Sequence, residues 1–188
     1  MGRKHRKAPI PTPPWQRMAA LEGDLLNVII ETPQGFRNKI KFDPAKGLFT
    51  IANVLTIGSE FPYDFGFVPG TMGEDGDPLD VLVLMDAPTF PGCWVPSRLL
   101  GVIEARQKER RGKTERNDRL LGVASGSQRY RGVHHIDDLG ARLLSEIEHF
   151  FVQYNQMRGK EFDPIGRRGP KHARRLVEQG AARVGAGG

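Results

Sequence analysis

Three aspartates lie within six residues of the sequence, in the segment Glu74-Asp75-Gly76-Asp77-Pro78-Leu79-Asp80. Alternate side chains of an extended backbone point the same way, so Asp75 and Asp77 can converge on one ligand. Carboxylates at this spacing repel one another unless a cation or a raised pKa relieves the repulsion. All-oxygen donors suit Mg²⁺ or Mn²⁺ and are a poor match for zinc. The segment therefore indicates a divalent-cation site, and composition alone leaves an ordinary acidic turn open as the alternative.

The elements that must position this segment are expected to be short strands. A long Gly/Pro/Asp-rich connection from Phe61 to Pro78 leads into the apolar run that follows the third aspartate. Several short strands at this spacing predict a small barrel or sandwich. The expected strands are Leu26 to Glu31, Asn38 to Phe42, Leu48 to Leu55, Val81 to Leu84, Trp94 to Val95, Arg98 to Ala105 and Leu120 to Ala124.

The last third of the sequence is expected to be helical. One group of apolar residues recurs at helical spacing and would form a single face. Its members are Leu139, Leu143, Leu144, Ile147, Phe150, Phe151 and Tyr154. A second helix is expected from Pro170 to about Arg183, since proline is favoured in the first helical turn. Strands followed by packed helices place the chain in the α+β class.

Length and charge predict one domain with short tails. The chain has 188 residues and a formal net charge of +6, and a chain of this length can bury a sizeable core. Five basic and no acidic residues fall within residues 1–17, together with four prolines, so this segment is expected to be a disordered arm. The single domain is expected over residues 18–184, and residues 185–188 form a flexible tail. The folded part is nearly neutral, which disfavours nucleic acid as a partner.

Cysteine content and hydropathy narrow the class of protein further. Cys93 is the single cysteine, which excludes an intramolecular disulfide framework and a cysteine-based zinc site. No apolar run approaches the roughly 18 residues that a membrane span requires. The basic N-terminus lacks the apolar stretch of a secretory signal. A cytoplasmic protein is therefore expected.

The stretch from Phe61 to Leu84 resembles the signature of the soluble family I inorganic pyrophosphatases. That signature is an aromatic/Gly/Pro run, then D-[GS]-D-P-x-D, then an apolar strand. Val28 to Pro33 with Asn38-Lys39 is similar to the family's first acidic strand and substrate lysine, and His149 to Tyr154 to its helical H-F-F-x-x-Y segment. The resemblance covers about Leu26 to Arg183. It implies an OB-like five-stranded β-barrel with flanking C-terminal helices.

The resemblance also implies hydrolysis of inorganic pyrophosphate to two phosphates by water that Mg²⁺ ions activate, with Mn²⁺ as a possible substitute. Asp75 and Asp80 would hold the activating ions together with Asp77, which would also accept the proton of the attacking water. Glu31 would help to bind a further ion. The phosphate oxygens would be contacted by Lys39, Arg119 and Tyr154. Because bacterial relatives commonly form hexamers, a homo-oligomer is implied too.

Each of the three phosphate contacts has a plain structural alternative. Tyr154 completes an apolar helical face and could be a core tyrosine. Lys39 could lie on a solvated strand face, and Arg119 lies in the basic run from Arg110 to Arg119, where an exposed charge is the commoner outcome.

Several positions depart from the family pattern. Lys41, Gln107 and Asn117 stand where the family has carboxylates, so the expected metal cluster keeps four acidic side chains and gains a cation. A lost metal ligand costs about 10–100-fold in affinity or activity even when it acts from the outer shell. On the phosphate side, Asn53 and Asn155 stand where the family has basic residues, and two family tyrosines become phenylalanines at positions 61 and 65.

Two hypotheses follow from these departures. The first is a working Mg²⁺-dependent pyrophosphatase with rearranged metal sites. The second is a protein of the same fold that binds metal or phosphate without turnover. Compensating carboxylates would have to come from the strand-loop-strand unit that carries Glu104, Glu109, Glu115 and Asp118.

Overall fold

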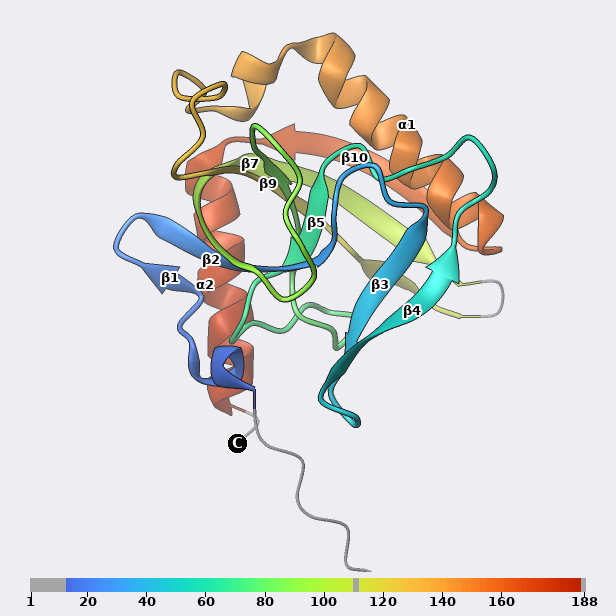
Figure 1. The fold of residues 1–188 in the computed structure, drawn as a ribbon, viewed down its shortest axis with the longest axis horizontal. Coiled ribbons are helices and arrows are strands. Elements are labelled where there is room, and N and C mark those ends of the chain that lie inside the picture. Colours follow the sequence, from blue (N-terminus) through green and yellow to red (C-terminus); the bar gives the residue numbers. More distant parts are fainter. Residues whose placement is uncertain (1–12, 110–111, 187–188) are drawn as a thin grey trace, which may run out of the picture.

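Five strands close into a barrel in the computed structural model, which describes residues 13–109 and 112–186. β2 (Leu25–Thr32) pairs with β5 (Asp64–Phe67), and β5 with β6 (Asp80–Leu84), both antiparallel. β6 runs parallel to β9 (Arg119–Ala124), which pairs antiparallel with β7 (Trp94–Lys108). β7 then returns to β2 and closes the ring. The expected OB-like five-stranded barrel is confirmed (Figure 1).

Further strands extend this ring. β1 (Leu21–Glu22) pairs with β2, while β8 (Thr114–Arg116) and β10 (Glu161–Arg168) both pair with β7. A separate two-stranded hairpin consists of β3 (Asn38–Asp43) and β4 (Leu48–Val54). The hairpin stands at one side of the barrel, where it can contribute side chains to the barrel's mouth (Figure 1).

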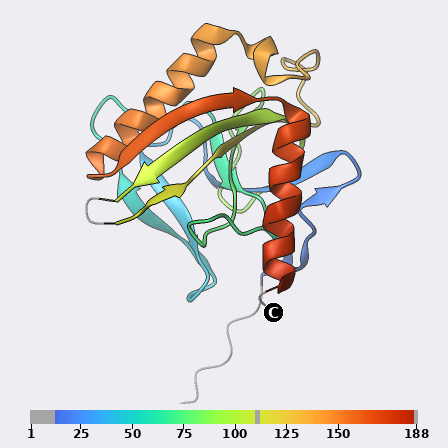
Figure 2. The same ribbon diagram turned by 180° about the vertical axis from the view of Figure 1, so that it is seen from behind.

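Two long helices flank the barrel, as expected for an α+β fold. The short 3-10 helix η2 (Ile136–Leu139) leads into α1 (Ala141–Met157), and α2 (Pro170–Ala186) follows β10. The predicted apolar face of α1 packs into one core cluster, whereas α2 packs Ala173 and Val177 into a second cluster. Figure 2 shows β10 running between the two helices. Among the residues that the structure describes, no helix is long and apolar enough to cross a membrane.

The strand assignments differ from expectation in five places, two of which are the unexpected short strands β1 and β8. The two short strands expected at positions 94–95 and 98–105 are one long strand, β7, whose pairing with β9 shifts register between Leu99 and Gly101. β5 lies inside the segment expected to be a Gly/Pro-rich connection. β10 was not expected, because Pro164 and Gly166 interrupt its pattern. The structure places the register shift of β10 between these two residues, so the sheet tolerates the proline.

The expected disordered arm is wrong for residues 14–17. They form the 3-10 helix η1 (Pro14–Arg17), and Trp15 packs edge-on against Phe42 at 5.2 Å between ring centroids and against Phe49 at 5.7 Å. Burial of the large aromatic ring of Trp15 is sufficient to order this short proline-rich segment. Residues 1–12 of the expected arm lie outside the described residues.

The expected flexible tail is wrong for its first two residues, because α2 continues through Ala186. Residues 187–188 lie outside the described residues.

Gly66 allows the two strands β2 and β5 to approach closely. A Cβ atom at this position would overlap the carbonyl oxygen of Ile29 and lie 2.9 Å from the Cα atom of Ile30. Both neighbours are backbone atoms of a buried strand, so neither can move aside without disturbing the barrel.

Gly66→Ala is therefore expected to lower the free energy of unfolding by about 3 kcal/mol or more, the upper range for overpacked cores. Urea denaturation followed by circular dichroism measures this change. Gly126→Ala is the matched control, since a Cβ there meets nothing within 4 Å. Equal stabilities of the two variants would contradict the close-approach argument.

Candidate active site

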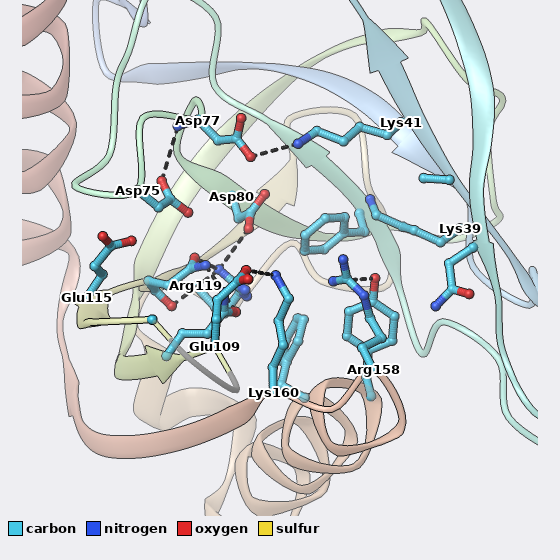
Figure 3. A pocket seen from close by; sticks show the side chains of 18 of the residues that line it. Lys39, Lys41, Asp75, Asp77, Asp80, Glu109, Glu115, Arg119, Arg158 and Lys160 are labelled. Carbon is cyan, nitrogen blue, oxygen red and sulfur yellow. Dashed lines mark hydrogen bonds and ion pairs between the residues drawn. The ribbon is translucent and has the colours of Figure 1, made fainter.

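A cavity of about 980 Å³ opens between the β3–β4 hairpin, the barrel's mouth and α1. Six of the seven expected site residues line it, and Figure 3 labels all of them except Tyr154. These six are Lys39, Asp75, Asp77, Asp80, Arg119 and Tyr154. The seventh, Glu31, lines an adjacent cavity of about 370 Å³ that also reaches Lys41, Asp77 and Asp80.

The three aspartates of the acidic segment face the same cavity from the connection between β5 and β6. Asp75 and Asp77 lie in the turn, and Asp80 is the first residue of β6. One carboxylate oxygen of Asp75 accepts the backbone N–H of Asp77 at 3.2 Å, and Gly76 has a positive φ of 80° that lets the turn close. Burial raises the pKa of Asp75, and the charges of Asp80 and Asp77 raise it further. The carboxylates are thus close enough to repel one another.

The pairing of β6 with β9 sets Asp80 beside Arg119. The two residues are register partners at the start of parallel strands, and Nη1 of Arg119 lies 2.7 Å from Oδ2 of Asp80. Arg119 is only 4% exposed, and its guanidinium lies 5.0 Å from the ring of Phe151 and 5.2 Å from that of Phe162. The alternative of an exposed charge at Arg119 is therefore wrong.

Lys41 reaches from the hairpin to the acidic segment. Its ammonium nitrogen lies 2.7 Å from Oδ2 of Asp77, and both side chains are about half exposed. Burial works against the charge on Lys41, but the hydrogen bond to Asp77 and the neighbouring carboxylates outweigh it and raise the pKa of Lys41. The proposed proton acceptor is thus engaged by a side-chain cation.

Lys39 and Glu31 form a buried ion pair at the base of the hairpin, with 3.0 Å between Nζ and Oε2. The ammonium group lies 4.1 Å from the ring centroid of Phe65 and 5.5 Å from that of Phe61. Burial lowers the pKa of Lys39, although Glu31 opposes this effect. The other oxygen of Glu31 accepts the backbone N–H of Phe42 at 2.8 Å. Lys39 does not lie on a solvated strand face.

Tyr154 belongs to both the core and the cavity. Its ring lies parallel to that of Phe150 on α1 at 6.0 Å between centroids, and it packs against Phe61. Its hydroxyl oxygen accepts a hydrogen bond from Nη1 of Arg158 at 3.3 Å. Burial raises the pKa of this hydroxyl. The apolar body is therefore fixed while the polar end reaches the cavity.

Five of the seven departures from the family pattern line the cavity, namely Lys41, Asn53, Phe65, Gln107 and Asn117. Asn117 donates to the side-chain oxygen of Gln107 and accepts from Arg119, so these amides form a chain of hydrogen bonds. Asn155 is different because it is buried in α1 and donates to the carbonyl of Phe151 at 2.9 Å. It does not line the cavity.

Two of the four candidate compensating acids do not line the cavity. Asp118 binds Arg116 and the backbone N–H of Ala105, and Glu104 binds Arg116 and Arg168. Glu109 and Glu115 do line the cavity. Glu109 is paired with Lys160.

Three basic residues that line the cavity were not expected from the sequence: Lys113, Arg158 and Lys160. Arg158 follows Tyr154 by four residues, which is one helical turn, and Lys160 comes just before β10. This spacing was readable in the sequence. Because β10 was not predicted, nothing indicated that the chain returns past the cavity after α1.

The donor chemistry of the acidic segment fits a divalent cation, since three carboxylates face one cavity, and burial together with the charges of Asp80 and Asp77 raises the pKa of Asp75. Among the described residues, however, no group of three or more acidic, histidine or cysteine side chains is gathered closely enough to hold an ion. Lys41 and Arg119 instead pair with Asp77 and Asp80. A metal ion would have to share these carboxylates with the side-chain cations.

Comparison with known proteins gives one consistent result. A family model described as inorganic pyrophosphatase matches residues 28–185. An inorganic pyrophosphatase of Synechocystis sp. is 38% identical over 155 residues, covering 82% of this chain and 89% of the relative. One from Geobacillus stearothermophilus is 35% identical over 164 residues, covering 87% and 96%. The crystal structure of the Thermus thermophilus inorganic pyrophosphatase matches with a TM-score of 0.82 at 31% identity, covering 90% and 98%.

The contribution of the buried Lys39–Glu31 ion pair to stability can be tested by substitution. Glu31→Gln keeps an acceptor for the N–H of Phe42 but leaves a buried ammonium without its counter-charge, so we expect a loss of about 3 kcal/mol in the free energy of unfolding. The double variant Glu31→Gln/Lys39→Met removes both charges and is expected to recover most of this loss. Urea denaturation of the three proteins measures both steps. A double variant no more stable than Glu31→Gln would show that the pair is not coupled.

Proposed function

The chain belongs to the inorganic pyrophosphatase family, and we propose that it hydrolyses pyrophosphate to two phosphates with divalent metal ions, Mg²⁺ in the first place. The observation that carries the proposal is the single cavity in which the acidic segment faces fixed cationic and hydroxyl groups. Asp75, Asp77 and Asp80 line it together with Lys39, Arg119 and Tyr154.

The charge of the cavity wall supports a requirement for metal ions. Six basic and five acidic side chains line the cavity, so the wall is close to neutral. Pyrophosphate carries several negative charges at neutral pH, and the basic side chains are largely engaged by the acidic ones. Additional positive charge is therefore needed to bind the substrate and to stabilise its transition state.

We assign the ions to Asp75 and Asp80 with Asp77, and a further ion to Glu31 in the adjacent cavity. A bound Mg²⁺ supplies neutralisation of phosphate charge and a lowered pKa for a coordinated water. Mn²⁺ prefers the same oxygen donors and is the expected substitute.

The chain's own groups bind the substrate and move the proton. The guanidinium of Arg119, held between Asp80 and two aromatic rings, is positioned to donate to a phosphate oxygen. The hydroxyl of Tyr154 and the ammonium of Lys39 add donors from two other elements. Lys41 binds one carboxylate oxygen of Asp77, and the other oxygen is not bonded to Lys41. We assign to Asp77 the role of accepting the proton of the attacking water.

The homo-oligomer and the cytoplasmic location stay predictions. The resemblance favours a hexamer, which light scattering of the purified protein would detect.

Replacing the proton acceptor tests the proposed chemistry. Asp77→Asn keeps the size of the side chain but removes the base, so phosphate release from pyrophosphate is expected to fall by about 10²–10⁴-fold. A chelator is expected to abolish release by the unchanged protein. Asp43→Asn is the matched control, because Asp43 pairs with Lys46 in the hairpin turn and does not line the cavity.

The proposal fails if the unchanged protein releases no phosphate across a wide Mg²⁺ and Mn²⁺ titration. Metal-dependent phosphate binding in calorimetry would then favour the hypothesis of a fold that binds without turnover.

The hydroxyl of Tyr154 is tested by Tyr154→Phe. Loss of one hydrogen bond to a charged group costs about 1.5–3 kcal/mol, so kcat/KM for pyrophosphate is expected to fall by about one to two decades. The melting temperature should change little, because the ring and its packing stay. A core tyrosine without contact to substrate would leave kcat/KM unchanged.

A further inference from the structure

Lys41 lies among three carboxylates that come from different elements. Its ammonium nitrogen is 2.7 Å from Asp77, and the charges of Glu31 and Asp80 also act on it. Lys41, Asp77 and Asp80 line both the main cavity and the adjacent cavity that contains Glu31. The ammonium group therefore lies where the two acidic regions meet.

We infer that Lys41 is a built-in counter-cation of the acidic segment, which competes with a divalent metal ion for Asp77 and reduces the number of ions that the site binds. The inference rests on the proposed metal binding by this segment. It adds a role for a residue at a position where the family pattern has a carboxylate.

The chemistry of the pair supports this role. A monovalent ammonium with three donors can satisfy one carboxylate oxygen of Asp77 and lower the repulsion among its neighbours. A divalent ion that approaches the same oxygens meets a like charge a few ångströms away, and it must displace the ammonium or bind farther off. In either case its affinity falls.

Lys41 differs from Arg119, the other cation that pairs with the acidic segment. Arg119 is buried, bonded to Asn117 and held against two aromatic rings. Lys41 is half exposed, and its partner Asp77 is also half exposed. The Lys41–Asp77 pair can therefore open at small cost, because exposed pairs contribute about 1 kcal/mol or less, whereas Arg119 stays in place. Competition with metal is thus expected at Asp77.

Calorimetric titration of the full chain with Mn²⁺, in the absence of pyrophosphate, tests the inference. Lys41→Gln removes the charge and keeps a side chain of similar reach, so Mn²⁺ affinity is expected to rise by about tenfold. Lys41→Glu adds a carboxylate and is expected to increase the number of ions bound as well. Lys171→Glu is the charge-matched control, because Lys171 is exposed at the start of α2 and does not line the cavity.

The outcomes separate this inference from the proposed function. An unchanged Mn²⁺ isotherm for Lys41→Gln, with native circular dichroism, overturns the inference whether or not pyrophosphate is hydrolysed. The absence of Mn²⁺ binding in all variants overturns it too. A rise for both Lys41 variants and none for Lys171→Glu supports it, even if phosphate release proves absent and the proposed function falls.

Discussion

The parallel pairing of β6 with β9 is the constraint on which the cavity depends. It is the one parallel pair among the described strands, and it makes both strands begin at the same end of the barrel. The acidic segment that precedes β6 and the polar residues that precede β9 therefore lie at the same open end of the barrel. Asp80 and Arg119, each the first residue of its strand, become direct neighbours as a result. The β3–β4 hairpin and α1 then cover this mouth and complete the site.

Inside the mouth, the carboxylates are balanced mainly by side chains of the same protein. Glu31 has Lys39, Asp77 has Lys41, and Asp80 has Arg119. These pairs differ in burial, and burial decides how each behaves. Removing one partner of a buried ion pair is costly, so the Lys39–Glu31 pair at the base of the hairpin holds its two side chains in place. A half-exposed pair can exchange partners, so the pair on the rim is open to competition by other ions.

Local patterns in the sequence were sufficient for the apolar face of α1 and for the acidic segment. For the strands they left a small barrel or a sandwich open and missed β5, so the five-stranded barrel was expected only from the resemblance to the pyrophosphatases. Local patterns also failed for β10, because Pro164 and Gly166 interrupt its pattern and only the neighbouring edge of β7 rescues it. They could not give the partner of Asp77 either, since Lys41 is 36 residues away and meets it only once the hairpin folds over the mouth. Asp118 was a reasonable substitute ligand by position, but its carboxylate is engaged by Arg116 and by the backbone N–H of Ala105, and it does not line the cavity.

The aromatic contact of Trp15 with Phe42 and Phe49 links the first described turn of the chain to the hairpin. Phe42 directly follows Lys41 on β3, and its side chain lies on the opposite face of that strand. An expressed fragment that begins after residue 17 would lack the indole ring of Trp15 that covers this face. β3, which carries Lys39 and Lys41 into the cavity, would then lose the packing of Trp15 against its other face. A truncation outside the cavity would in this way disturb the position of two cavity side chains.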